Sequence, residues 1–288
     1  MSNKKPSQPA YHTFGYEWAH ELEFDILDHL GSDSCVELIP ENFTSGRFDT
    51  FLKALEKMGT PVAVHGVLLS IGSMDELNQK HLDAVLEVGK QVNMVNFSEH
   101  LSLTGVQDIA LDALTPLAWN HEVADVICRK IDRIQSQIKV PFLIENVSNR
   151  FVIPGSDLSE TAFINTILRK TGCGLLLDVT NVYTNSINFK FDPYAWIDEI
   201  DLARTELIHL AGGFVDPDGF LMDSHDNSVA PEAWDLYRYA VSKAPPLMTI
   251  IERTGNFPNF EALNQELDFA RGAVREVHPD YSRLEVLA

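Results

Sequence analysis

The stretch Gly174–Asn181, with the sequence GLLLDVTN, decides how this chain is expected to fold. An unbroken apolar run leads into Asp178, and Asn181 follows three positions later. Such a run, closed by a carboxylate, is typical of a strand that is buried on both faces and carries its polar residue at the C-terminal end. For this strand alone, Asp178 as the N-cap of a following helix is an equally good interpretation. The pattern of an apolar strand ending in Asp, Glu or His recurs, however, at least six times along the chain.

Predicted strands alternate with predicted helices along the chain. The strands are a short one at 11–16, then CVELIPEN (35–42), PVAVHGVLL (from 61), VNMVNFSEHL (92–101), PFLIENV (141–147), GLLLDVTN (174–181), ELIHLAGG (206–213) and LMTIIERTG (247–255). Helices are predicted near 17–30, 48–58, 75–90, 122–137, 159–171, 194–202, 231–242 and 259–276, and 102–119 is expected to be a long loop. This α/β alternation favours parallel pairing through right-handed crossovers and a closed (β/α)8 TIM barrel. An open doubly wound sheet is the alternative, but no glycine-rich phosphate turn follows an early strand.

The length and the cysteines limit the domain organisation. We expect a disordered tail at 1–10 and a single barrel domain over 11–288, a usual size for this fold. The three cysteines, Cys35, Cys128 and Cys173, lack a CxxC spacing, so we expect buried structural thiols instead of disulfides or a zinc knuckle. The charged N-terminus has no apolar segment after it, and no apolar run approaches the ~20 residues that cross a bilayer. A cytoplasmic protein without a membrane partner is therefore expected.

The charge balance limits the partners. Lys and Arg number 22 against 42 Asp and Glu, which gives a formal net charge of −20. Such a surface repels phosphate backbones and anionic lipids, so no nucleic-acid partner is expected. The acidity is compatible with a basic peptide or protein partner.

Ionisable side chains stand at the ends of the predicted strands. In a barrel of this kind the C-terminal strand ends converge on one face, where active sites are built. The residues expected there are His65, His100, Glu145, Asp178, His209 and Glu252, with Asn181 and the loop residues Asp223 and His225 beside them. Each one alone has an ordinary structural explanation, but buried unpaired carboxylates need compensation, which divalent metals supply. Histidine and carboxylate ligands without a thiolate suit iron, manganese or zinc.

Several of these segments resemble, in order and spacing, the motifs of the DUF692 family. The segments are HGVLLSIG (65–72), SEHL (98–101), ENVS (145–148), LLLDVTNVYTNSIN (175–188), IHLAGG (208–213), DSH (223–225) and IERTGNFPNF (251–260). These relatives are multinuclear non-heme iron-dependent oxidative enzymes, such as those of methanobactin and 3-thiaglutamate biosynthesis. The resemblance implies a xylose-isomerase-like TIM barrel, with a metal site similar to the trinuclear site of the endonuclease IV superfamily.

The resemblance also implies a set of ligands. One metal would be held by His65, His100 and Glu145. Glu145 would bridge to a second metal held by Asp178, His209 and Glu252, and a third, more labile metal would be held by Asn181, Asp223 and His225. Glu41, Glu99 and Asn146 are candidates for outer contacts that orient these ligands, although Glu41 and Glu99 are equally interpretable as solvated loop charges.

The activity implied by the resemblance is oxidation of a peptide. It would use two or three irons, mixed Fe(II) and Fe(III), with dioxygen as co-substrate. The substrate would be a ribosomally synthesised precursor peptide, most often modified at cysteine, and a small partner protein would deliver it. Substrate sulfur on one iron beside oxygen activation at its neighbour gives a reason for two adjacent sites.

Other functions remain open on the sequence. A zinc- or manganese-dependent barrel hydrolase or sugar isomerase or epimerase would use similar ligands, and a non-catalytic scaffold or metal-storage protein is a third interpretation. Phosphodiester cleavage fits poorly with the net charge of −20. An isomerase often uses a lysine near its metals, and none stands at a strand end.

The chain departs from the family pattern at the rim of the predicted site. HTFGYEW (12–18) replaces a GxGLR-like opening, and Ala211-Gly212-Gly213 stands where the family often has AGH. Thr180-Asn181 replaces Asn-Asn, and Glu252-Arg253-Thr254 replaces ERD. None of these changes removes a proposed primary ligand, but together they leave the substrate open.

Overall fold

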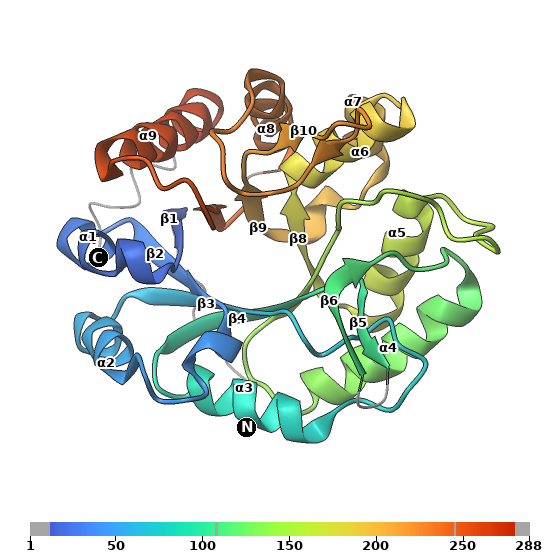
Figure 1. Cartoon of the computed structure of the whole chain (residues 1–288), viewed down its shortest axis with the longest axis horizontal. Helices are drawn as coiled ribbons and strands as arrows, with labels where there is room; N and C mark the ends of the chain where they lie inside the picture. Colours follow the sequence, from blue (N-terminus) through green and yellow to red (C-terminus); the bar gives the residue numbers. More distant parts are fainter. Residues whose placement is uncertain (1–11, 107–108, 245, 280–288) are drawn as a thin grey trace.

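Eight parallel strands form a closed barrel in the computed structural model, which describes residues 12–106, 109–244 and 246–279 (Figure 1). Around the barrel the strands follow the order β1-β12-β9-β8-β7-β4-β3-β2. Their bounds are β1 Thr13–Glu17, β2 Ser34–Leu38, β3 Pro61–Gly66, β4 Asn93–His100, β7 Phe142–Glu145, β8 Gly174–Asp178, β9 Thr205–Leu210 and β12 Met248–Ile251. The predicted TIM barrel is confirmed. The tail predicted at 1–10 lies outside the described residues.

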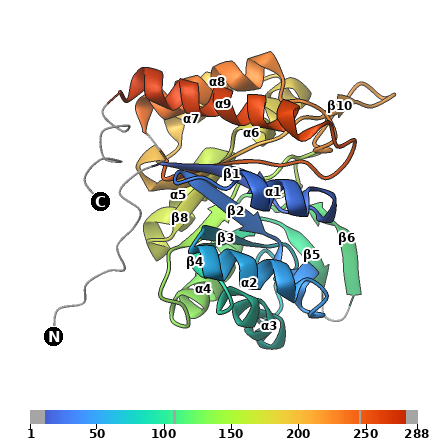
Figure 2. The same ribbon diagram turned by 90° about the vertical axis from the view of Figure 1, so that its left-hand side faces the viewer.

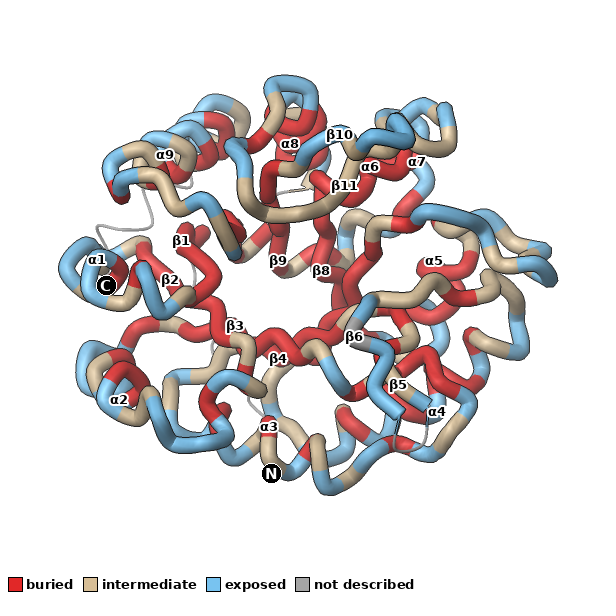
Figure 3. Tube along the Cα trace, in the orientation of Figure 1, coloured by how far each residue is buried: buried red, intermediate tan, exposed pale blue. Residues whose placement is uncertain are grey.

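Helices surround the barrel and connect its strands. They are α1 Glu23–His29, α2 Asp49–Met58, α3 Gln79–Gly89, α4 His121–Gln135, α5 Glu160–Thr171, α6 Val179–Phe189, α7 Pro193–Glu199, α8 Pro231–Lys243 and α9 Phe260–Val277, with short 3-10 turns at His20–Leu22, Pro40–Phe43 and Leu202–Arg204. Six helices begin at a side chain that accepts a backbone N–H, namely Asn78, Asn120, Ser159, Asp178, Asp192 and Asn259. Figure 3 shows buried residues along the strands and exposed residues on the outer sides of the helices. The main apolar core therefore lies between barrel and helices.

The interior of the barrel holds an apolar layer followed by a polar one. The apolar layer includes Cys35, Ala63, Leu143, Leu176, Leu207 and Ile250. Residues two apart on a strand face the same side, so the next inward positions on these strands are Glu37, His65, Glu145, Asp178, His209 and Glu252. Each of these six residues is at most 4% exposed. Because side chains alternate along each strand, ionisable groups from distant parts of the sequence all face the mouth of the barrel.

Three local features differ from the expectation. The segment expected as a loop at 102–119 contains an antiparallel hairpin of β5 Leu103–Val106 and β6 Ile109–Thr115. A second small hairpin, β10 Phe214–Val215 with β11 Leu221–Met222, follows β9, and Figure 2 shows β6 and β10 projecting from the same end of the barrel. Helix α6 follows β8 directly, so the strand predicted to reach Asn181 ends at Asp178, and the alternative interpretation of Asp178 as the N-cap of a helix is confirmed. The three cysteines are free and buried, as expected.

A cavity of about 330 Å³ lies between α5, α6 and α7. Its walls include Trp119, Phe191 and Trp196, and Glu160 from the first turn of α5 faces it. Glu160 Oε2 accepts a hydrogen bond of 2.9 Å from Trp196 Nε1. Burial raises the pKa of Glu160 to about 7, and the Trp196 hydrogen bond opposes only part of that increase.

This carboxyl group predicts a pH dependence of stability. The unfolded chain loses the Glu160 proton near its ordinary pKa of 4.5, whereas the folded protein keeps it until about pH 7. Folding stability contributed by Glu160 therefore falls as the pH rises through this window. We expect Glu160→Gln to raise Tm by a few degrees at pH 8 and to leave Tm at pH 4.5 nearly unchanged, because about 1 kcal/mol shifts Tm by about 2 °C in a chain of this size.

Thermal unfolding followed by circular dichroism from pH 4.5 to 8 tests this expectation. Glu122→Gln is the matched control, because Glu122 is an exposed acidic residue in the first turn of α4. Equal changes in Tm for the two variants at pH 8 would contradict the assignment to Glu160.

Candidate metal centre

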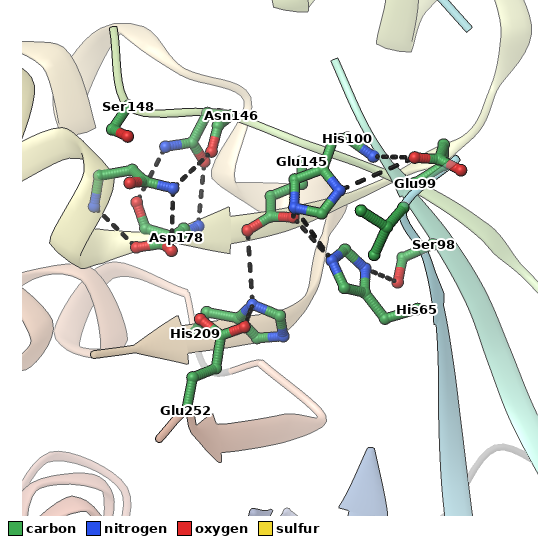
Figure 4. A network of polar contacts seen from close by, with 12 residues as sticks. His65, Ser98, Glu99, His100, Glu145, Asn146, Ser148, Asp178, His209 and Glu252 are labelled. Carbon is green, nitrogen blue, oxygen red and sulfur yellow. Dashed lines mark hydrogen bonds and ion pairs between the residues drawn. The ribbon is translucent and has the colours of Figure 1, made fainter. Parts of the chain in front are cut away.

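The first pocket brings together two imidazoles and one carboxylate at the ends of β3, β4 and β7. The Nε2 atoms of His65 and His100 lie 3.2 Å apart, and each is 3.1 Å from Glu145 Oε2. Figure 4 shows the three side chains pointing toward one another. Metal bonds of about 2.1 Å place neighbouring donor atoms about 3.0–3.4 Å apart. The spacing of these three atoms is that of ligands around one ion.

The outer nitrogens of the two rings explain why lone pairs face the pocket. His65 Nδ1 lies 2.8 Å from Ser98 Oγ, and His100 Nδ1 faces Glu99 Oε1 at 3.7 Å. With these nitrogens protonated, both Nε2 atoms present lone pairs to Glu145 Oε2, which is buried and has no hydrogen-bond partner among the described residues. Three converging acceptors repel one another unless a proton or a metal ion lies between them. The residues present therefore fit a metal ion.

The second pocket shares Glu145 with the first. His209 Nδ1 lies 3.4 Å from Glu145 Oε1 and 3.2 Å from Glu252 Oε1. One ligand atom each from Glu145, Asp178 and His209 lies within 4.8 Å of the others. His209 Nδ1 and Glu252 Oε2 are buried and have no hydrogen-bond partner in the described part of the chain. Glu145 is placed so that its two oxygens face two separate pockets.

Glu37 was not among the residues expected from the sequence, yet it touches the second pocket. Its Oε2 lies 2.9 Å from His209 Nε2, and both side chains are fully buried. A hydrogen bond from His209 Nε2–H to Glu37 directs the Nδ1 lone pair into the pocket. The sequence does indicate its position, because Glu37 follows the inward-facing Cys35 by two residues on β2 and so faces the barrel interior as well.

Asp178 has both roles that its sequence context suggested. Its Oδ1 accepts the N–H of Asn181 at 2.7 Å and so caps α6, while the carboxylate faces Glu145 and His209. Asn146 holds the backbone of Asp178, since its amide accepts from Asp178 N at 3.0 Å and donates to Asp178 O at 2.9 Å. Asn146 therefore fixes the strand end that carries a pocket carboxylate.

The loop after β9 brings Asp223 and His225 to the same mouth. His225 Nε2 lies 2.7 Å from Asp223 Oδ1 and 3.9 Å from Glu252 Oε2. His225 has a φ of 52°, a left-handed conformation that is uncommon for a residue with a side chain. Thr254 N holds it by donating to His225 O at 2.9 Å. A strained backbone at a cluster of ionisable groups is typical of a functional site.

The remaining predicted residues lie around these pockets. Asn181 Nδ2 donates to Asp178 Oδ2 at 3.0 Å and to Asn146 O at 3.2 Å. Glu99 Oε2 accepts Leu69 N at 3.1 Å and so ties the β3 loop beside His100. Glu41 lies in the 3-10 turn after β2 and accepts Val67 N and Leu68 N at 3.1 Å, with His81 Nε2 at 3.0 Å. Glu41 therefore fixes the loop that follows His65 and does not contact the imidazole of a predicted metal ligand.

The charges in the pockets influence one another strongly. Burial alone would raise the pKa of Glu145, but the neighbouring His100 and His65 hold that pKa well below its usual range. Burial likewise opposes the imidazolium of His209, yet Glu252 and Glu37 hold its pKa well above the usual value. Burial, assisted by Asp223 and the other carboxylates, raises the pKa of Asp178 well above its usual range. Without a metal the pockets retain protons, which a metal ion would displace.

One side of the centre is open to solvent. The side chains of His225, His100 and Asp223 are 20%, 12% and 12% exposed, whereas Glu145 is 2% exposed. The cluster is therefore in contact with solvent beside His100 and the Asp223 loop.

Gly213, where the chain departs from the AGH that the resembled family often has, has a structural reason to be glycine. A Cβ at Gly213 would lie 1.9 Å from Met222 O, because β11 packs directly against this backbone. Only glycine permits that approach. The rim of the site is therefore built from a hairpin backbone at a position where the resembled family often has histidine.

The sequence matches a family model over most of its length. Residues 13–275 match the model described as the RiPP precursor modification enzyme MbnB/TglH/ChrH, where RiPP denotes a ribosomally synthesised and post-translationally modified peptide. A UPF0276 protein of Acaryochloris marina is 32% identical over 241 residues, which cover 84% of this chain and 87% of that protein. A UPF0276 protein of Rhizorhabdus wittichii is 36% identical over 238 residues, covering 82% and 84%.

Solved structures support the fold. A D-psicose 3-epimerase in the presence of D-fructose superposes with a TM-score of 0.58 at 12% identity, covering 92% of this chain and 99% of that one. A xylose isomerase-like TIM barrel protein from Mycobacterium smegmatis in complex with magnesium gives 0.54 at 11% identity, with 89% of each chain covered. At this identity the likeness shows the architecture alone. No helix within the described residues is long and apolar enough to span a membrane.

Proposed function

Because the chain belongs to the MbnB/TglH/ChrH family of RiPP precursor modification enzymes, we propose that it is a multinuclear iron-dependent oxidase that uses dioxygen to modify a cysteine of a precursor peptide. The observation that carries this proposal is the pair of pockets that share Glu145. Two adjacent sites allow a substrate and an oxidant to be held side by side. A small partner protein that delivers the peptide completes the proposal.

The donor set supports iron in these pockets. His65, His100 and Glu145 would hold one ion, and Asp178, His209 and Glu252 with the other oxygen of Glu145 would hold the second. Two imidazoles with a carboxylate are a ligand set that open non-heme iron sites use. When bound, iron would supply one-electron redox chemistry with dioxygen.

The protein contributes orientation and access. Ser98 and Glu37 fix the rings of His65 and His209, so their lone pairs face the pockets before an ion arrives. The exposed edges of His100 and His225 leave a path for a peptide side chain. The net charge of −20 favours a basic segment in the peptide or its carrier.

Sugar isomerases often use a lysine near their metals, and no lysine stands at a strand end of this chain. Among the described residues the buried lysine is Lys130 of α4, whose Nζ donates to Ser73 O at 2.6 Å and to Ser70 O at 3.3 Å. These hydrogen bonds hold Lys130 against the loop that follows β3. No specific observation therefore favours the isomerase over the oxidase.

Co-expression of the protein with the short peptides encoded beside its gene tests the activity. We expect a cysteine-containing peptide to change mass only when oxygen and the wild-type protein are both present, and to lose its reaction with iodoacetamide. Glu145→Gln should leave the peptide unmodified. An iron-loaded protein that consumes no oxygen with any such peptide would contradict the proposal.

A further inference from the structure

The cavity between α5, α6 and α7 is a second candidate binding site, separate from the mouth of the barrel. Its volume of about 330 Å³ lies within the usual range for small-molecule sites. Among its lining residues Asn185 and Trp196 are buried, whereas Val152, Asp192 and Glu199 are exposed. The cavity therefore reaches from the interior of the helical layer to solvent.

Negative charge and aromatic rings dominate the lining of this cavity. Its ionisable residues are Glu160, Asp192 and Glu199, and no lysine, arginine or histidine lines it within the described part of the chain. The aromatic residues on its walls are Trp119, Phe189, Phe191 and Trp196. The faces of aromatic rings attract cations, and carboxylates add a direct charge attraction. The lining is therefore suited to a positively charged group that carries an apolar chain.

Two of the three carboxylates have structural roles. Asp192 Oδ1 accepts Tyr194 N at 2.9 Å and so caps α7. Glu199 Oε2 accepts a hydrogen bond of 2.7 Å from Thr161 Oγ1 and thereby joins α7 to α5. Both acidic residues are exposed, so water solvates their charges. These contacts leave Glu160 as the carboxylate whose position needs another explanation.

Glu160 keeps acceptor positions available inside the cavity. Its Oε2 accepts Trp196 Nε1–H at 2.9 Å, and its Oε1 lies 3.4 Å from Asn149 Nδ2. Neither donor is charged, and a carboxylate offers about four lone-pair positions. Burial that no charged group of the described residues compensates raises the pKa of Glu160 to about 7. Ionisation of Glu160 is therefore unfavourable until a cation lies beside it.

We propose that this cavity binds an organic cation, an ammonium or guanidinium group at the end of an apolar chain, with Glu160 as its counter-ion. Trp119 and Trp196 would contact the chain. A metal ion would need several converging ligand atoms, and the groups of this kind in the described chain all lie at the barrel mouth. An alkylamine and a lysine or arginine side chain share the proposed chemistry. This inference goes beyond the proposed function and is independent of the metal centre.

Titration of the full chain with n-butylammonium tests the site, followed by NMR of the tryptophan indole N–H groups. Trp119 and Trp196 line the cavity, whereas Trp18 and Trp234 do not. We expect the signals of the first two to shift and those of the other two to stay. Substitution of each tryptophan by phenylalanine assigns the signals.

The affinity should depend on the charge of Glu160. Glu160→Gln keeps the shape and the acceptor for Trp196, and we expect it to bind butylammonium about tenfold more weakly or worse. Glu122→Gln, which removes an exposed charge from the first turn of α4, should bind as the wild type does. Butan-1-ol has the same chain without the charge and should bind about tenfold more weakly or worse.

The pH dependence of binding gives a second readout. Butylammonium stays protonated between pH 6 and pH 8, whereas Glu160 ionises in this range. Affinity should therefore rise about tenfold from pH 6 to pH 8 in the wild type and stay constant in Glu160→Gln. Asp192 and Glu199 are the other ionisable groups that line the cavity. A rise that persists in Glu160→Gln would overturn the role of Glu160.

A further probe identifies the source of the cation. Nα-acetyl-lysine methylamide carries a lysine side chain on a blocked backbone. If it binds as tightly as butylammonium, the cavity accepts a basic side chain of a peptide or protein. If butylammonium alone binds, the ligand is a free amine, and both results support the site.

Three results would overturn the inference. They are no binding of either cation at millimolar concentration, equal affinity for butan-1-ol and butylammonium, and unchanged affinity in Glu160→Gln. Circular dichroism checks that this variant is folded. If it is not, the comparison of butylammonium with butan-1-ol on the wild type decides the question.

Discussion

Replacing Glu145 with Gln is expected to remove the ions of both shared pockets. The carboxylate oxygens of Glu145 face His65 and His100 on one side and His209 on the other. Gln keeps the shape but loses the charge and turns one oxygen into an N–H donor that faces imidazole lone pairs. The loss of affinity should exceed the about 10–100-fold that changes to outer contacts cost. Iron retained after anaerobic gel filtration should fall below half an equivalent per chain for these two sites.

Glu41→Gln is the matched control for this experiment. Glu41 is a partly buried carboxylate in the same end of the barrel, but it binds loop N–H groups and His81. We expect its metal content to equal that of the wild type. Circular dichroism of both variants checks that the barrel is intact. Two irons retained by a folded Glu145→Gln variant would show that Glu145 does not bridge the pockets.

The second large effect is expected at Glu37, which binds no metal in this account. Its carboxylate accepts a hydrogen bond from His209 Nε2 and thereby sets the tautomer of the ring. Glu37→Leu removes the acceptor, so His209 is free to protonate Nδ1 and turn its lone pair away from the pocket. We expect iron affinity of the second pocket to fall about 10–100-fold. Anaerobic titration with Fe²⁺ measures this affinity.

Glu37→Gln distinguishes orientation from packing and charge. The amide oxygen of Gln still accepts from Nε2–H, so this variant should recover most of the affinity that Glu37→Leu loses. The first pocket, with His65 held by Ser98, should be unaffected in both variants. Equal losses in the Gln and Leu variants would indicate that the charge of Glu37 matters and that the hydrogen bond does not.

The barrel and the end at which its ionisable side chains gather could be predicted because six of the eight strands repeat one local pattern. An apolar inward residue such as Leu176 is followed two positions later by an ionisable one such as Asp178. The period of a strand makes both residues face the interior, and parallel strands bring the second residue of each pair to one end. The residues that combine into pockets follow from this rule without any knowledge of loops.

Glu17 and Glu37 follow the same rule but were not selected. The second strand was expected over 35–42, so Glu41 near its end was considered, whereas β2 ends at Leu38 and a 3-10 turn begins at Pro40. The first strand was expected at 11–16, so Glu17 fell into the predicted helix, although it is the last residue of β1. An error of one to four residues at a strand end decides which carboxylate faces the centre.

The missed helix and hairpin depend on contacts outside their own sequences. Helix α6 is rich in β-branched and polar residues with low helix propensity, and its cap is supplied by Asp178. The hairpin of β5 and β6 is held at Thr104 N and Gly105 N by Ser70 Oγ, at 3.0 and 3.1 Å. Ser70 lies 34 residues before Thr104, so the local sequence of the hairpin does not indicate the contact that holds it.

Anaerobic purification followed by elemental analysis and Mössbauer spectroscopy shows which metal the protein holds and whether the ions are coupled. We expect two or three irons per chain in a coupled cluster of Fe(II) and Fe(III), with the coupling lost in Glu145→Gln. Stoichiometric zinc without iron, persisting after expression in iron-replete medium, would contradict the iron oxidase and favour a metallohydrolase on the same barrel.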